Sequence, residues 1–449
     1  LGTAAAPTLA AAWTFSTAAH GDMGNLQSTP IVHDGCAFIA STSGIVYAIN
    51  AATGAEVWQH QLSVVTPGSS GDVVGALATT AGHIIALVNQ AGDGINGPYV
   101  AALDEQSGSP VWTSSPITTL SGYYTNASAQ VFNGVVFAGF SPPEGQNGAT
   151  GGFGLIDAGT GLLLTVTPTI PLSRQAQGFA GGGIWSTPAF DPATGFAYVG
   201  AGNPYSKTQE DQNTNAILKI DLRPKSPTFG AIVAAYKGNV DQYTQALQQL
   251  SQTPACAASQ SAPSPLDDPV CGQLDLDFGA SPNLFVDAGH LVVGDLQKSG
   301  VYHAADATSM APVWNTIVGG SCLVCNAAST AVADGSVFGE ATPGGVAFAL
   351  SQADGTRQSA TAVSDGIHYE ATSTADGVVY TADTTGFLDA FDAATGLPLL
   401  RHPMALDTGA PTANLTADGI AIAYHTLYAT ASEGSGSGSN SGGFLIAYR

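Results

Sequence analysis

A pair of carboxylates is the feature of this sequence that most directly suggests chemistry. Asp275 and Asp277 stand two residues apart in the stretch LDLDFGASP, residues 274–282. In a β-strand, residues i and i+2 share one face, so both side chains could reach one cation, unless Asp277 is only structural. A carboxylate kept ionised by a nearby cation can take the proton of a bound hydroxyl group. The alternative for Asp275 is a turn-capping role.

A second candidate feature is an indole and an amide that delimit one hairpin. The stretch GGGIWSTPAFDPATGFAYVGAGNPY, residues 181–205, contains Trp185, a turn at 191–195, a β run at 196–200 and then Asn203. Trp185 and Asn203 therefore begin and end one hairpin and lie at the same end of the sheet. Taken singly, Trp185 could be a core aromatic residue and Asn203 a turn residue. The pair in its hairpin is the more specific signal.

This hairpin resembles that of the quinoprotein alcohol dehydrogenases, which use pyrroloquinoline quinone (PQQ) and a metal ion inside a β-propeller. The eighteen-residue spacing (203 − 185) matches the family. The resemblance implies that Trp185 forms the flat floor under the quinone and that Asn203 is a metal ligand. It also implies that Glu144 is a bidentate metal ligand, and that Asp275 is the catalytic base or an electrostatic partner and binds the metal.

Three more residues match the family. Lys298, twenty-three residues after Asp275 (298 − 275), matches the basic residue that faces the quinone oxygens, where a cation stabilises developing negative charge. An isolated lysine is otherwise a solvated surface charge. Asn326 matches an asparagine that contacts the quinone. Asp277 is similar to the extra carboxylate of family members that use lanthanides, so both Ca²⁺ and a lanthanide ion stay open, with calcium favoured.

Together these matches imply a PQQ-dependent alcohol dehydrogenase. Asp275 would take the hydroxyl proton, hydride would pass to the quinone C5, and Lys298 with the metal would polarise that carbonyl. Electrons would leave to an external acceptor such as a cytochrome c, because the Cys322-x-x-Cys325 motif is followed by Asn326 rather than the His of a haem site. A non-catalytic propeller scaffold that binds a peptide or glycan is the alternative.

The match to the family is not uniform. The family's adjacent Cys-Cys pair is absent, and Leu274 stands where a Trp is usual. The D-x-D-F-G-A-S-P stretch and the chain length are more similar to the polyvinyl alcohol dehydrogenase branch, which suggests a secondary or polymeric alcohol as substrate.

Internal repeats predict the fold. A unit of the form S/T-x-P-x-V-x-x-G, a β run, and A-x-D-x-x-T-G-x-x-x-W recurs along the chain, as is typical of antiparallel four-stranded blades. The units span 28–58, 75–112, 125–164, 181–236, 277–314, 326–361, 368–401 and 409–449. The last lacks its final strand, which residues 11–16 supply with Trp13. We therefore predict an all-β single domain over 1–449, an eight-bladed β-propeller whose last blade is closed by the N-terminal strand.

Other parts of the repeat have structural readings. Trp58, Trp112 and Trp314 are expected to pack between blades beside the D-x-x-T-G turns. Residues 239–272 break the pattern and predict an insertion with a short helix, which could shape a substrate entrance or be a surface decoration. Cys256–Cys271 and Cys322–Cys325 are expected disulfides, and Cys36 a buried thiol, which suits an oxidising compartment.

Charge and hydropathy exclude several classes of partner. The formal net charge is −23, from 33 acidic and 10 basic residues, which disfavours nucleic acids and anionic membranes. The acidic residues suit a hard cation. No apolar run reaches the length of a transmembrane helix. The chain starts at Leu1 without Met, so we expect a processed protein in the periplasm or outside the cell.

Overall fold

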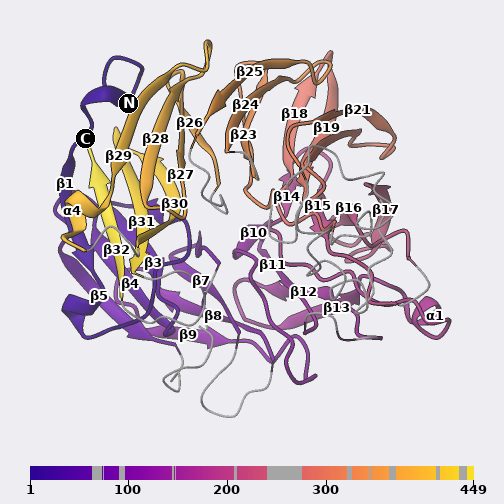
Figure 1. Cartoon of the computed structure of the whole chain (residues 1–449). Helices are drawn as coiled ribbons and strands as arrows, with labels where there is room; N and C mark the ends of the chain where they lie inside the picture. The colour runs from indigo at the N-terminus through magenta and orange to yellow at the C-terminus, as the bar shows by residue number, and fades with distance from the viewer. Residues whose placement is uncertain are drawn as a thin grey trace. The chain divides into compact units, whose positions relative to one another are not determined.

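The structure is a computed structural model that consists almost entirely of β-strands (Figure 1). It describes residues 1–62, 73, 75–89, 97–143, 146, 148–206, 210–239, 276–320, 326–342, 345–363, 371–410, 415–433 and 442–449. The chain forms two compact units, one of Leu1–Ala138, Ile156–Leu164 and Tyr369–Arg449, the other of Gly139–Leu155 and Thr165–His368. The single domain over 1–449 stays a prediction. The predicted insertion lies outside the described residues except for Asn239.

The strands form eight four-stranded sheets, which confirms the predicted eight-bladed β-propeller. The first three sheets in chain order are made of β2 (Ile31–His33), β3 (Cys36–Ala40), β4 (Ile45–Asn50) and β5 (Glu56–Gln61); β6 (Ala78–Thr80), β7 (His83–Val88), β8 (Tyr99–Asp104) and β9 (Pro110–Thr113); and β10 (Gln130–Phe132), β11 (Val135–Phe140), β12 (Gly152–Asp157) and β13 (Leu163–Pro168).

The next four sheets follow the same order along the chain. They are made of β14 (Ala189–Asp191), β15 (Phe196–Ala201), β16 (Ala216–Asp221) and β17 (Ile232–Lys237); β18 (Asn283–Asp287), β19 (His290–Gln297), β20 (Val301–Asp306) and β21 (Pro312–Ile317); β22 (Ala331–Ala333), β23 (Ser336–Ala341), β24 (Val346–Ser351) and β25 (Arg357–Ala362); and β26 (Ser373–Ala375), β27 (Val378–Ala382), β28 (Phe387–Asp392) and β29 (Pro398–Pro403).

The N-terminal strand completes the eighth sheet, as predicted. This sheet runs in the order β1 (Ala11–Ser16), β32 (Gly443–Tyr448), β31 (Thr426–Glu433) and β30 (Leu415–Ala423). β1 pairs antiparallel with β32, with Ala11 opposite Tyr448 and Ser16 opposite Phe444. The last sheet thus joins the two ends of the chain, and β32 has a pairing partner on both sides.

In most blades a short turn sets the register between the first and second strands. Asp34 and Gly35 join β2 to β3 with φ of 43° and 79°, and Asn133 and Gly134 join β10 to β11 with φ of 49° and 77°. Positive φ at both central residues defines the two-residue turn that matches the twist of antiparallel strands. The Asp-Gly and Asn-Gly pairs in the sequence therefore specify these hairpins locally.

The recurring spacing of tryptophan and the D-x-x-T-G turn within this chain has a packing origin. Gly54 has a φ of 76°, and a Cβ atom there would lie 2.7 Å from the indole of Trp13. Trp13 also donates its Nε1–H to the carbonyl of Ala51 at 3.2 Å. The same close approach joins Trp58 to Gly108, Trp112 to Gly161 and Trp314 to Gly355. The predicted role of these indoles between blades is confirmed.

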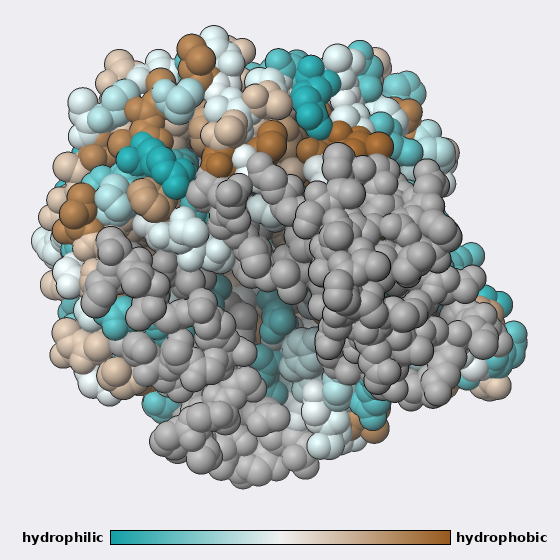
Figure 2. Space-filling model, viewed as in Figure 1, coloured by the Kyte–Doolittle hydropathy of each residue, from teal (hydrophilic) through white to brown (hydrophobic). Residues whose placement is uncertain are grey.

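Burial distinguishes the second and third strands of a blade from the fourth. β7 and β8 are buried along almost their whole length, whereas β21 and β25 alternate between exposed and half-buried residues. On the face shown in Figure 2, exposed apolar residues lie singly or in small groups among polar residues. Four short helices complete the described part: η1 (Ala6–Thr8), η2 (Ala18–His20), α1 (Leu172–Gln175) and α4 (Ala405–Thr408).

The cysteines and the membrane-spanning potential of the chain were the subject of two further expectations. Cys36 lies in β3 without a disulfide, but it is half-buried rather than buried. The four other cysteines, and with them both expected disulfides, lie outside the described residues. Among the described residues, no helix has the length and apolar character needed to cross a membrane.

Candidate active site

The Asp277 carboxylate joins three residues that come from separate parts of the sequence. Its Oδ2 atom accepts hydrogen bonds from Trp185 Nε1 and from Lys298 Nζ, both at 3.2 Å. Its Oδ1 atom accepts a short hydrogen bond from the main-chain N–H of Asn203. The structure therefore brings four of the predicted site residues together, with Asp277 at their centre.

Lys298 and Asp277 form a buried ion pair beside the indole. Their side chains are 9% and 6% exposed. The Lys298 main-chain N–H also donates to the Asp277 carbonyl at 3.0 Å, so the two residues are joined twice. The ammonium lies 5.0 Å from the centroid of the half-buried Trp185 ring, within the range of a cation–π interaction. Lys298 is thus a buried cation of the site and not a solvated surface charge.

Glycines allow the main chain around Trp185 and Asn203 to pack closely. Gly181 has a φ of 106°, and a Cβ atom there would lie 2.2 Å from the Asn203 carbonyl oxygen. Gly182 donates its N–H to that carbonyl at 2.9 Å, and Gly202 donates to the Gly183 carbonyl at 2.8 Å. These bonds hold the residues before β14 against the residues after β15. They keep Trp185 and Asn203 at one end of the hairpin, as predicted.

Gly279 determines how far the indole can extend. A Cβ atom at this position would lie 2.0 Å from the Cη2 atom of Trp185. Asp277 therefore holds the pyrrole end of the indole by a hydrogen bond, while the bare main chain at Gly279 lies against the opposite end. The plane of the ring is fixed from both ends by one short segment.

Asn326 supports the main chain of the site. Its Nδ2 atom donates to the carbonyls of Lys298 at 3.2 Å and Gly320 at 2.7 Å, and its Oδ1 atom accepts from Thr342 N at 3.1 Å. Both amide N–H groups thus have main-chain partners. In this structure the Asn326 side chain positions Lys298, and its predicted contact with a quinone stays a prediction.

A buried polar layer lies behind the ion pair. Gln297 Nε2 donates to the carbonyl of Leu276 at 2.7 Å, which connects the neighbours of Lys298 and Asp277. Gln297 Oε1 in turn contacts His303 Nε2 at 3.0 Å, and Tyr236 Oη contacts His303 Nδ1 at 3.0 Å. Burial lowers the pKa of His303 to about 3, because a charged imidazolium would lose its hydration. His303 is therefore a neutral hydrogen-bonding residue of this layer at pH 7.

The residues present suit the cofactor and metal that the sequence suggests. Asn203 is 2% exposed, and its Nδ2 atom has no hydrogen-bond partner among the described residues. Rotating the amide by half a turn would place its oxygen there, and amide oxygens are ligands for hard cations. The half-buried Trp185 ring with the Lys298 cation suits a flat, electron-poor, anionic ring system. Glu144 and Asp275 lie outside the described residues.

One geometric expectation was wrong, and one residue was undervalued. Asp277 lies in a loop six residues before β18 begins at Asn283 (283 − 277), so the strand assumed for it is absent. That Asp275 and Asp277 reach one cation stays a prediction, because Asp275 lies outside the described residues. Sequence reasoning treated Asp277 as an optional second ligand, and it did not anticipate its bonds to Trp185 and Lys298. Gly279, two residues later, was the available signal, since a glycine allows another group to approach the main chain closely.

Comparison with known proteins finds quinoprotein dehydrogenases among the proteins that this chain is similar to. Residues 3–202 match the family described as outer membrane protein assembly factor BamB. The chain is 28% identical over 327 residues to a polyvinyl alcohol dehydrogenase of Sphingopyxis sp. (strain 113P3), covering 67% of this chain and 46% of that protein. It is 24% identical over 248 residues to the quinoprotein alcohol dehydrogenase PedH of Pseudomonas putida (strain KT2440), covering 48% and 40%.

A solved structure shows the same fold over the full chain. The quinohemoprotein alcohol dehydrogenase from Comamonas testosteroni superposes with a TM-score of 0.72 at 16% identity, covering 100% of this chain and 77% of that one. This chain is thus an eight-bladed β-propeller that is similar to quinoprotein alcohol dehydrogenases. The resemblance inferred from the sequence is confirmed. The chain spans less than half the length of the two relatives.

Proposed function

We propose that this chain catalyses the PQQ- and metal-dependent oxidation of an alcohol to a carbonyl compound. The convergence of Trp185, Asn203 and Lys298 on Asp277 carries the proposal. A buried ion pair is weak evidence for stability, because taking both charges out of water is costly. Such a pair beside a half-buried indole therefore favours a functional role. The relatives named as dehydrogenases support the same reaction.

Each of the proposed site residues would have a separate role in the reaction. Bound PQQ would supply an electrophilic quinone carbon that accepts hydride from the carbinol carbon. Trp185 would carry the flat ring system, and Lys298 would stabilise the negative charge that develops on the quinone oxygens. Asp275 would accept the hydroxyl proton, so that loss of a proton and a hydride leaves the carbonyl product. The electrons would then leave to an external acceptor such as a cytochrome c.

Glu144, Asn203 and Asp275 would hold the metal ion. The Lys298 ammonium already lies 3.2 Å from Oδ2 of Asp277. A second cation on the same oxygen would be repelled by it, which weighs against Asp277 as an added ligand for a trivalent lanthanide. We therefore favour Ca²⁺, with Asp277 as the residue that positions Trp185 and Lys298. A periplasmic or secreted location is part of the same proposal.

Titration of metal-depleted protein with PQQ plus Ca²⁺, and separately with PQQ plus La³⁺, tests the proposal. The quinone absorbance reports binding, and dye reduction with primary, secondary and polymeric alcohols reports turnover. We expect one PQQ per chain and turnover that Asp275→Ala abolishes, while Asp354→Ala, in an exposed turn, keeps it. If PQQ does not bind with either metal, the proposed dehydrogenase activity is refuted.

A non-catalytic scaffold that binds a peptide or glycan is the second candidate. The observation in its favour is the match of residues 3–202 to the assembly-factor family. A scaffold has no chemical need for a lysine–aspartate pair under an indole, so Lys298→Met should leave peptide or glycan binding unchanged. In the dehydrogenase the same variant loses turnover, and the two assays together separate the candidates.

A further inference from the structure

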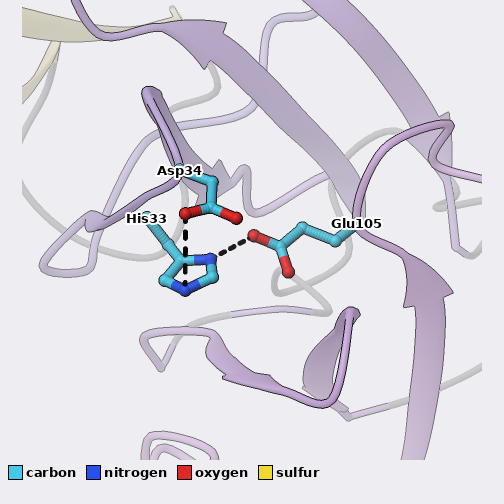
Figure 3. A group of neighbouring side chains, drawn as sticks. All are labelled: His33, Asp34 and Glu105. Atoms are coloured by element: carbon cyan, nitrogen blue, oxygen red, sulfur yellow. Dashed lines mark hydrogen bonds and ion pairs between the residues drawn. The ribbon is translucent and has the colours of Figure 1, made fainter.

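A histidine and two carboxylates from neighbouring blades meet at one point of the unit that contains Leu1–Ala138. His33 ends β2, Asp34 lies in the turn to β3, and Glu105 follows β8. His33 Nδ1 hydrogen-bonds directly to Glu105 Oε1, and His33 Nε2 lies 4.0 Å from Asp34 Oδ1 (Figure 3). One nitrogen and two carboxylate oxygens of the three residues lie within 4.8 Å of one another.

Glu105 is unusual among the equivalent residues of the blades. In seven blades, the residue that follows the third strand donates its main-chain N–H to a carbonyl at or next to the turn between the first two strands of the same blade. In the second blade Glu105 makes this bond, to the Gly82 carbonyl at 2.8 Å. The counterparts of Glu105 are Ala51, Ala158, Leu222, Ala307, Gln352 and Ala393. Glu105 is the one acidic residue of this set, and it is 9% exposed. A buried carboxylate is costly unless a positive charge compensates it, so the position calls for a cationic partner.

His33 is the one histidine at its position in the repeat. The residues before the other described two-residue turns are Thr80, Phe132, Asp287, Ala333, Ala375 and Ala423. The blade with the imidazole is thus the neighbour of the blade with the glutamate, and the two side chains meet. This coincidence of two departures from the repeat indicates a local site rather than ordinary packing between blades.

The main chain holds the three residues rigidly. The Glu105 carbonyl accepts the Nε1–H of Trp58 at 3.0 Å. Asp34 sits in a tight turn with a φ of 43°, and His33 pairs with Cys36 across that turn. The main chain is thus fixed at all three residues, and the His33 and Asp34 side chains are 47% and 86% exposed, so a metal ion could reach them from solvent.

We propose that His33, Asp34 and Glu105 bind one divalent transition-metal ion of the zinc type, with water completing its coordination. An imidazole nitrogen with two carboxylate oxygens is a ligand set that zinc accepts and that calcium, which prefers oxygen ligands, does not favour. The ion would link two neighbouring blades of one unit. This site is separate in its residues and in its ligand chemistry from the alcohol-oxidising site and does not depend on that function.

Zinc titration of the chain of residues 1–449, with Ca²⁺ in excess to occupy oxygen-only sites, tests the proposal. Calorimetry with Zn²⁺ and absorption spectroscopy with Co²⁺ report the site. We expect one Zn²⁺ per chain, with His33→Ala and Glu105→Ala each weakening binding at least about tenfold. Glu105→Ala is expected to fold, because four counterparts are already alanine.

His20 provides the matched control. His20 Nδ1 lies 2.7 Å from Glu56 Oε2, a histidine–glutamate pair of similar kind, but this pair is not part of a three-residue ligand group in the described structure. His20→Ala should keep the zinc affinity of the parent chain. Equal affinity in the parent and in Glu105→Ala, or no zinc binding by the parent, would overturn the proposal and leave His33 and Glu105 as an ion pair only.

Discussion

The indole N–H of Trp185 donates a 3.2 Å hydrogen bond to Oδ2 of Asp277, a residue ninety-two positions away in the sequence. The same oxygen accepts from Lys298 Nζ, and that ammonium lies 5.0 Å from the indole centroid. One carboxylate therefore sets both the tilt of the ring and the position of the cation beside it. A flat ligand on the indole would meet a charge whose place is already fixed.

Asp277→Asn is predicted to damage both the fold and the site. The amide keeps the shape but not the charge, so Lys298 is left as a buried cation without its ion pair. Breaking a buried pair in this way costs about 3–5 kcal/mol. We expect urea denaturation to show a loss of this size and PQQ titration to show at least a tenfold weaker affinity.

The control for Asp277→Asn is the same change at Asp354, which lies in an exposed turn. Asp354→Asn should alter neither PQQ affinity nor stability by more than about 0.5 kcal/mol. If Asp277→Asn behaves like this control, Asp277 does not organise the site.

Gly279→Ala is predicted to displace the indole without changing any charge. The added methyl group would lie 2.0 Å from Cη2 of Trp185, so the ring must tilt or the loop must move. Overpacking of this kind costs about 1–3 kcal/mol. We expect weaker PQQ binding and a changed near-ultraviolet circular dichroism spectrum. Gly2→Ala is the control, because its nearest atom would lie at an ordinary 3.5 Å, and an unchanged PQQ affinity in Gly279→Ala would contradict the prediction.

Local sequence signals were enough to predict the fold. The Asp34-Gly35 and Asn133-Gly134 turns need positive φ at both residues, and these residue types adopt it readily. The recurrence of such turns with the D-x-x-T-G motif gave the eight blades, and the missing last strand pointed to Trp13. Each of these signals acts within a few residues or repeats along the chain, which is why a single sequence reveals them.

The site was only partly predictable, for a physical reason. Trp185 and Asn203 share a hairpin, so their proximity follows from local structure. The bonds of Asp277 to Trp185 and Lys298 depend on how a loop lies across two blades, and no short-range pattern specifies that. The same holds for Asn326, whose amide supports the main chain of Lys298. The contact of His33 with Glu105 also escaped the sequence analysis, because the two residues lie seventy-two positions apart and in different repeats.

Gly54→Ala is predicted to separate the effect of the indole from the effect of the backbone. Gly54 and Gly134 have nearly equal φ of 76° and 77°, but only Gly54 lies against an indole, since a Cβ at Gly134 would meet nothing within 4 Å. Both variants should lose about 1–2 kcal/mol from the left-handed conformation. Gly54→Ala should lose about 1–3 kcal/mol more through its clash with Trp13. Equal losses in urea denaturation would show that the indole contributes nothing to the requirement for glycine.

The neutral His303 predicts a specific dependence of stability on pH. Burial lowers its folded-state pKa from 6.5 to about 3. As pH falls through this window, the unfolded chain binds a proton that the folded chain does not, so the free energy of unfolding decreases by about 1.4 kcal/mol per pH unit. His303→Gln cannot take up this proton. Between pH 6.5 and 4.5 the parent should therefore lose about 2 kcal/mol more than the variant in urea denaturation, because the unfolded histidine is already half protonated at pH 6.5. Parallel curves would mean that His303 titrates normally in the fold.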